Sequence, residues 1–200
     1  WKAARRGADR VRLMTEVAGE SQMGLFRAAL KNWNSPPPVV FEPFAYEALK
    51  TANREVFGVD GLVSYRLDQA DVLVAFGAEF LETWLSPVEY AWKFKAMHAA
   101  RGPEKGFFSL VSPFQTVTGA NADRWLACAP GTEAVVALGL VRRILDSGRG
   151  KHLPPSLREA LEKATEPYQQ EAVLKLSGIP LSQYEQLVVR LTEARRPLVL

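Results

Sequence analysis

The chain has 200 residues, of which 48% are hydrophobic and 24% charged, and its formal net charge is +3. A chain of this length and composition can bury a sufficient core without disulfides, and its one cysteine, Cys128, excludes an internal disulfide or an iron–sulfur cluster bound by this chain alone. The small, scattered excess of positive charge argues against nucleic-acid binding, and the lack of an apolar run of about 18 residues argues against direct membrane insertion.

The N-terminal part alternates strand-like and helix-like segments. It predicts a short strand at residues 11–15, a helix over residues 21–33 capped by its first serine, and a second strand at residues 39–41. A second helix over residues 45–57 is expected to stop at Gly58, because glycine readily adopts the left-handed conformation that ends helices.

The central part carries the clearest signals for single elements. A continuous apolar run at residues 71–76 predicts a strand that is covered on both faces. Ser86, Pro87 and Glu89 have the types and spacing of a capped helix start. We expect this helix to end at residues 102–103, a glycine followed by a proline.

Two further strands and one strongly apolar helix follow. The strands are predicted at residues 107–111 and 124–128. Thr132 is a candidate cap for a helix over residues 133–146. This helix is too apolar to be mostly exposed, so we expect it to pack on the sheet.

The C-terminal part begins with a polar stretch rich in glycine and proline at residues 147–155. A helical region follows, in which Ser182 and Glu185 form a second candidate capping box. The apolar residues 198–200 then predict a strand that returns to the sheet.

Repeated strand–helix–strand units predict a Rossmann-like, doubly wound α/β fold, with a mainly parallel sheet, helices on both faces and a helical C-terminal segment. We expect one α/β domain over residues 1–200. It has a strand–helix core at residues 1–148, a linker and helices at residues 149–195, and the returning strand at residues 196–200. Because the sequence starts at Trp1 without an initiator methionine, we expect a fragment of a larger protein.

Ligands of parallel α/β sheets bind beyond the carboxyl ends of the strands. This rule nominates residues 77–83, 112–119 and 129–133 as a candidate ligand site. The sequence lacks the G-x-G-x-x-G fingerprint of dinucleotide-binding domains. Ordinary turns, hydrogen-bonded loops and helix caps also account for these three segments.

The sequence contains no recognisable catalytic set and no metal-ligand motif. His98 and His152 are the only histidines, and each is expected to be solvated or internally satisfied. Cys128 is expected to be a small core residue. Glu79 and Glu82 could pair as carboxylates, but solvated loop charges are the favoured interpretation.

Three segments in fixed order, together with a fourth near the C-terminus, carry a resemblance to a known family. Residues 70–80 are similar to the pattern A-D, apolar run, G-x-N-P; residues 112–123 are similar to D-P-R-x-T-x-T-A-x-x-A-D. Residues 125–134 are similar to a strand that leads into P-G-T-D-x-A, and residues 177–180 resemble T-G-V-P. Taken together, these stretches resemble the molybdopterin oxidoreductase family, in one of its Rossmann-like domains.

In that family the corresponding loops hold the guanine-dinucleotide part of the molybdopterin cofactor. The resemblance implies cofactor-binding roles for Gly77, Glu79, Ser112, Pro113, Thr116, Pro130, Gly131, Thr132 and Glu133. The chain departs from the pattern where Glu79 replaces asparagine, Ser112 replaces aspartate, and Phe114 replaces arginine. Loss of an arginine removes a charged contact to an anionic cofactor.

Other stretches are similar to one branch of the family, the molybdopterin-like subunit of quinol-oxidising complexes such as alternative complex III. They are residues 41–43, 65–71 and 84–87. This resemblance implies a cofactor-free scaffold domain that binds sister subunits. The parent would then be bacterial and peripherally membrane-associated, with iron–sulfur and membrane subunits as partners.

Three hypotheses follow for function. The first is a domain that contributes part of a molybdopterin guanine dinucleotide site in an electron-transfer enzyme, with any iron–sulfur cluster outside this fragment. The second is the cofactor-free scaffold domain of a respiratory complex. The third, a nucleotide-binding domain of another family, is disfavoured by the missing glycine fingerprint. The fragment is not expected to be active alone.

Overall fold

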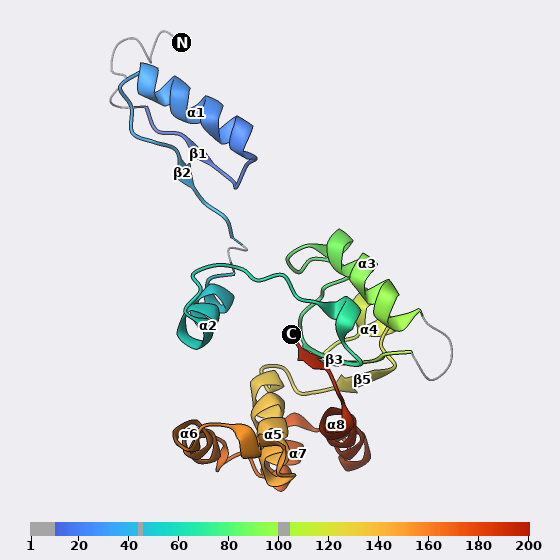
Figure 1. The fold of residues 1–200 in the computed structure, drawn as a ribbon. Helices are drawn as coiled ribbons and strands as arrows, with labels where there is room; N and C mark the ends of the chain where they lie inside the picture. The colour runs from blue at the N-terminus through green and yellow to red at the C-terminus, as the bar shows by residue number, and fades with distance from the viewer. Residues whose placement is uncertain (1–10, 44–45, 100–104) are drawn as a thin grey trace. The chain divides into compact units, whose positions relative to one another are not determined.

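The structure, a computed structural model, describes residues 11–43, 46–99 and 105–200 (Figure 1). The chain divides into two compact units, one within residues 1–64 and one within residues 65–200, and each is described by itself. The single domain expected from the sequence stays a prediction.

The first unit is a β-α-β-α segment. It consists of β1 (Met14–Thr15), α1 (Glu20–Asn32), β2 (Val39–Val40) and α2 (Glu47–Phe57). The two strands pair in parallel, as a helical crossover between them requires. As predicted, α2 stops at Gly58, which has a φ of 68°.

The start of α1 differs from the prediction. Ser21 lies inside the helix, and Gly19 occupies the capping position. Met23 and Leu30 are the buried residues of α1, whereas Leu25 is 67% exposed. Ala45, the predicted start of the second helix, lies outside the described residues.

The second unit contains a four-stranded parallel sheet with the strand order β5-β4-β3-β6. Its elements are η2 (Leu67–Gln69), β3 (Val72–Phe76), α3 (Pro87–His98), β4 (Phe107–Ser112), α4 (Val117–Ala120), β5 (Arg124–Ala127), α5 (Glu133–Asp146), η3 (Arg149–His152), α6 (Pro155–Thr165), α7 (Gln170–Ser177), α8 (Leu181–Glu193) and β6 (Pro197–Val199). The arrangement confirms the predicted Rossmann-like α/β class.

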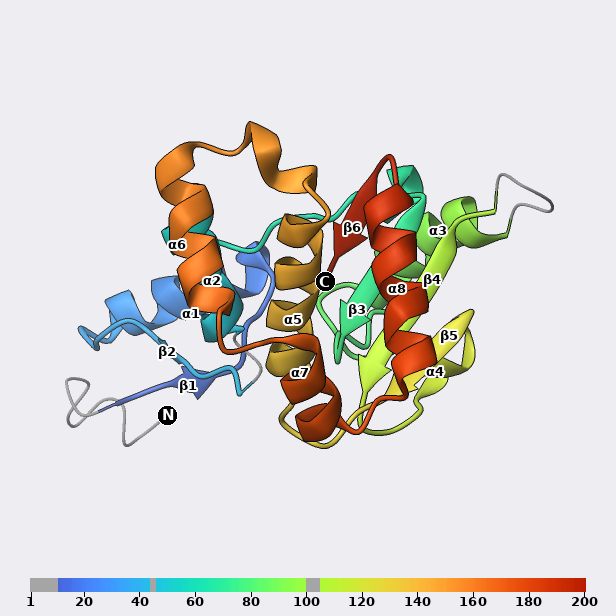
Figure 2. The same ribbon diagram turned by 90° about the horizontal axis from the view of Figure 1, so that it is seen from below.

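The sheet has a separate hydrophobic core on each face. Side chains alternate along a strand, so Val74 of β3 packs with Val136 of α5 and Leu187 of α8, whereas Leu73 packs with Phe94 of α3. Figure 2 shows α8 and α3 on opposite sides of the strands. Covering both faces explains why β3 is a continuous apolar run, as the sequence predicted.

The predicted capping residues lie at or near the starts of their helices, but their side chains make no capping hydrogen bond. Ser86 is the capping residue of α3, with proline in the first turn, but its side chain makes no capping hydrogen bond. Pro180, rather than Ser182, stands at the capping position of α8. Residues 102–103, the predicted stop of α3, lie outside the described residues.

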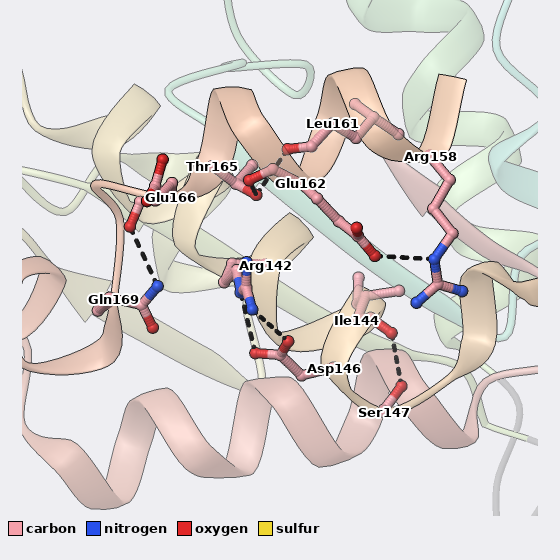
Figure 3. Close-up of polar contacts among 10 residues, drawn as sticks. All are labelled: Arg142, Ile144, Asp146, Ser147, Arg158, Leu161, Glu162, Thr165, Glu166 and Gln169. Atoms are coloured by element: carbon pink, nitrogen blue, oxygen red, sulfur yellow. Dashed lines mark hydrogen bonds and ion pairs between the residues drawn. The ribbon is translucent and has the colours of Figure 1, made fainter. Parts of the chain in front are cut away.

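The segment after α5 is helical and held by local polar contacts (Figure 3). Arg142 pairs with Asp146 at 2.9 Å on α5, and Arg158 pairs with Glu162 at 2.8 Å on α6. The hydroxyl of Thr165 donates to a backbone carbonyl one turn earlier, at 2.7 Å. Thr165 is the buried residue of α6, so this helix adds little to the core.

Candidate functional site

The predicted site residues lie in three loops that follow β3, β4 and β5. Because these neighbouring strands are parallel, their carboxyl ends share one edge of the sheet. The loops after β3 and β4 are joined by side-chain hydrogen bonds, whereas the loop after β5 is anchored to α7, where the Ala129 amide donates to the Ser177 carbonyl at 2.7 Å.

Gly77 makes the turn at the end of β3. Its φ is 62°, a conformation that other residues rarely adopt. Its amide donates to the carbonyl of Val111 on β4 at 3.1 Å. A Cβ atom at this position would have no neighbour within 4 Å, so the backbone here is open on one side.

Thr116 connects the two loops through its hydroxyl. The hydroxyl donates to the Glu79 carboxylate and accepts from the amide of Gly119 at 3.2 Å, which caps α4. The hydrogen and one of the two lone pairs of this hydroxyl are therefore used inside the protein.

Glu82 makes a second connection between the same loops. One carboxylate oxygen accepts from the amide of Val117 at 3.0 Å and, more weakly, from that of Thr118 at 3.5 Å. In return, the hydroxyl of Thr118 accepts from the amide of Leu81 at 3.3 Å. We call Glu79, Glu82, Thr116 and the amides of Val117 and Thr118 the carboxylate clasp.

The clasp corrects part of the interpretation of Glu79 and Glu82 as solvated loop charges, because Glu82 is exposed, as expected, whereas Glu79 is only partly exposed. Each carboxylate accepts hydrogen bonds from residues 116–118, more than thirty positions away in sequence. Sequence reasoning also missed any role for Thr118. The pairing of β3 with β4 could have predicted these contacts, because loops that follow neighbouring parallel strands lie side by side.

Ser112 supports the loop after β4 from inside. It is buried, and its hydroxyl donates to the carbonyl of Phe114 at 3.0 Å. Its own carbonyl accepts from the indole nitrogen of Trp125 at 3.0 Å. Pro113 stands between Ser112 and Phe114 in the sequence, and Phe114 is 62% exposed. This stretch offers apolar surface where the family pattern has an arginine.

The loop after β5 is more open than the other two. Gly131 has a φ of 79° with no neighbour within 4 Å of a Cβ position, and Pro130 beside it is exposed. Thr132 precedes α5, but its hydroxyl donates to the Ala129 carbonyl at 2.6 Å instead of capping the helix. Glu133 opens α5, so the start of this helix carries an acidic residue.

Cys128 lies at the end of β5 and is buried, as predicted. Burial raises the pKa of its thiol, and the negative charge of Glu133 raises it further. A thiol whose pKa is raised remains protonated at neutral pH and is a poor nucleophile. The residue therefore contributes packing to this edge and offers no reactive thiolate.

His98 is internally satisfied, as predicted. Its ring stacks on Phe94, with 4.6 Å between the ring centroids, and its Nε2 lies 2.8 Å from a carboxylate oxygen of Asp123. Within residues 11–43, 46–99 and 105–200, no group of three or more histidine, cysteine, aspartate or glutamate side chains is arranged to hold a metal ion.

Comparisons with known proteins relate the chain to one sequence and one fold. No family model matches it. Over 146 residues it is 27% identical to the menaquinone reductase, molybdopterin-binding-like subunit of Nitratidesulfovibrio vulgaris, a match that covers 73% of this chain and 21% of that protein. The acetylene hydratase of Pelobacter acetylenicus has a similar fold, with a TM-score of 0.63 and 17% identity over 99% of this chain and 27% of that one.

The curated relative, which is named as a molybdopterin-binding-like subunit, confirms the predicted resemblance to molybdopterin oxidoreductases. At 17% identity the structural match speaks for the fold alone. The chain spans only 21% of the length of the curated relative and 27% of the length of the solved structure.

Proposed function

We propose that this chain is a cofactor-free scaffold domain in a molybdopterin-oxidoreductase-related subunit of a respiratory complex. The carboxylate clasp is the observation that carries the proposal. It uses the hydroxyl of Thr116 and the first amides of α4 for contacts within the protein. Among these groups, Thr116 is a residue that the family resemblance assigns to the cofactor.

A guanine dinucleotide fits the loops after β3 and β4 poorly. Its phosphates would approach the carboxylates of Glu79 and Glu82, which are already oriented toward residues 116–118. Two like unit charges 4 Å apart repel by about 4 kcal/mol at an effective dielectric constant of about 20. None of the residues assigned to the site is cationic, so no side chain among them offsets this repulsion.

The second candidate function is a wall of a molybdopterin guanine dinucleotide site in an electron-transfer enzyme. The open backbone at Gly131 and the start of α5, which no side chain caps, favour it. Backbone amides at such a position can bind the oxygens of a nucleotide. Catalysis and any iron–sulfur cluster would then depend on residues outside this chain.

The proposed partners are other domains of the parent chain and the iron–sulfur and membrane subunits of the complex. The curated relative supports this, because its name describes a subunit of a menaquinone reductase. We propose that the parent is a bacterial protein that associates with the membrane peripherally. No helix formed by the described residues has the length and apolar character to cross a membrane.

Metal and pterin analysis of the intact parent, purified with its sister subunits, tests the proposal. We expect no molybdenum, tungsten or pterin above the level in a cofactor-free control protein purified from the same cells. A molybdoenzyme from those cells serves as the positive control. Stoichiometric pterin in the parent would refute the cofactor-free role and favour the second candidate.

A further inference from the structure

A groove with a volume of about 980 Å³ lies at the edge of the sheet opposite the clasp. Phe107 and Arg124, at the starts of β4 and β5, form one wall, and residues 185–193 of α8 form the other. We call it the amino-edge groove. The α8 wall extends for about 12 Å, because a helix rises about 1.5 Å per residue.

Part of the charge in this groove is neutralised within the protein. Lys105 Nζ lies 2.5 Å from an oxygen of Asp123, and Glu185 pairs with Arg143 at 3.0 Å. These contacts stabilise the walls and leave little charge for a ligand.

The remaining charge is positive. Arg124, Arg190 and Glu193 also line the groove, and none of them forms an ion pair with another described residue. The unpaired groups are therefore the two guanidinium groups of Arg124 and Arg190 and the carboxylate of Glu193, which together carry a net charge of +1. All three residues are exposed.

Arg190 is held in a defined position. Its guanidinium carbon lies 4.8 Å from the centre of the Phe107 ring, a cation–π contact. A stacked guanidinium keeps the N–H groups at its edge available, and their planar geometry matches both oxygens of a carboxylate. The ring thus orients a carboxylate-binding group at the mouth of the groove.

We propose that the amino-edge groove binds an acidic polypeptide segment in extended conformation, with its carboxylates on Arg124 and Arg190. An extended chain rises about 3.3 Å per residue, so about four residues match the α8 wall, and alternate side chains share one face. Asp123, Glu185 and Glu193 also line the groove. Glu193 is the one of these three that no described cation neutralises, and it disfavours ligands of dense negative charge such as phosphates and nucleic acid. This binding site does not depend on the proposed function.

The test uses the 200-residue chain and a fluorescein-labelled peptide of alternating glutamate and serine, about eight residues long. We expect fluorescence anisotropy to report binding with a Kd below about 1 mM, weakened by added salt. Arg124→Glu and Arg190→Glu should each weaken binding by at least about tenfold. Arg190→Gln, which removes the charge more conservatively, should weaken it in the same direction.

Lys163→Glu is the matched control, because it reverses a charge on the exposed surface of α6, away from the groove. It should leave the affinity within about twofold. A peptide of alternating glutamine and serine should not bind. The proposal is overturned if the glutamate peptide does not bind, if both peptides bind equally, or if the arginine variants bind as tightly as the control. Tighter competition by inorganic triphosphate than by unlabelled peptide would overturn it as well.

Discussion

Gly139 of α5 faces side chains of α7 and α8 at close range, and replacing it with alanine perturbs the helical layer on one face of the sheet. A Cβ atom there would lie 2.6 Å from Cγ2 of Val173 and 2.9 Å from the hydroxyl oxygen of Tyr184. Both side chains are fully buried, so neither can swing into solvent. Alanine at this position therefore requires α5 to move away from its neighbours.

The expected cost of Gly139→Ala is the difference between two effects. Alanine favours the helix by about 1 kcal/mol relative to glycine. Overpacking a well-filled core typically costs about 1–3 kcal/mol, and contact with two immobile side chains places this site in the upper part of that range. We expect a net destabilisation of about 1–2 kcal/mol and a fall in Tm of about 4 °C.

Urea unfolding followed by circular dichroism measures this change. Gly24→Ala is the matched control, because Gly24 lies inside α1 and a Cβ there has no neighbour within 4 Å. The same substitution should leave stability unchanged or raise it there. Introducing Gly139→Ala into a Val173→Ala background should reduce its cost, because the closest contact is gone. Stability equal to or above wild type for Gly139→Ala alone would refute the packing argument.

Three further predictions concern polar groups. The hydroxyl of Tyr184 is buried without a hydrogen-bond partner among the described residues, so Tyr184→Phe should raise the free energy of unfolding by about 1 kcal/mol in urea melts; a loss would contradict this. Burial would raise the pKa of Asp71, but amides of residues 195–196 at 2.8 and 2.9 Å bond its carboxylate and hold the pKa below its ordinary value. Its stabilisation is therefore present above the unfolded pKa of about 3.9 and lost as pH falls through the lower folded value. Asp71→Asn should cost about 1 kcal/mol at neutral pH and progressively less below about pH 4, whereas a pH-independent cost would contradict this. Glu82→Ala should increase hydrogen exchange at the Val117 amide, because it removes the acceptor at 3.0 Å, and unchanged exchange would argue against the clasp.

The sequence by itself determined the strands and the longer helices of the second unit, but it did not predict the short elements η2, α4 and η3. The apolar run at residues 71–76 specified a strand buried on both faces, and the apolar helix at residues 133–146 coincides with α5. These predictions succeed because the periodicity and amount of apolar surface are properties of a contiguous segment. The family relationship also rested on short contiguous motifs, in the loops after β3, β4 and β5.

Only the tertiary structure decided which partner each polar side chain finds. The Thr132 hydroxyl bonds the carbonyl of Ala129 instead of capping α5. Glu79 and Glu82 contact residues 116–118 because β3 and β4 are neighbours, and Arg190 stacks on Phe107 because α8 lies over β4. Each of the last three contacts joins segments more than thirty residues apart in the chain, where local sequence signals have no reach. At the edge that motifs assign to a cofactor, the loops after β3 and β4 are therefore joined by carboxylates whose partners depend on strand order.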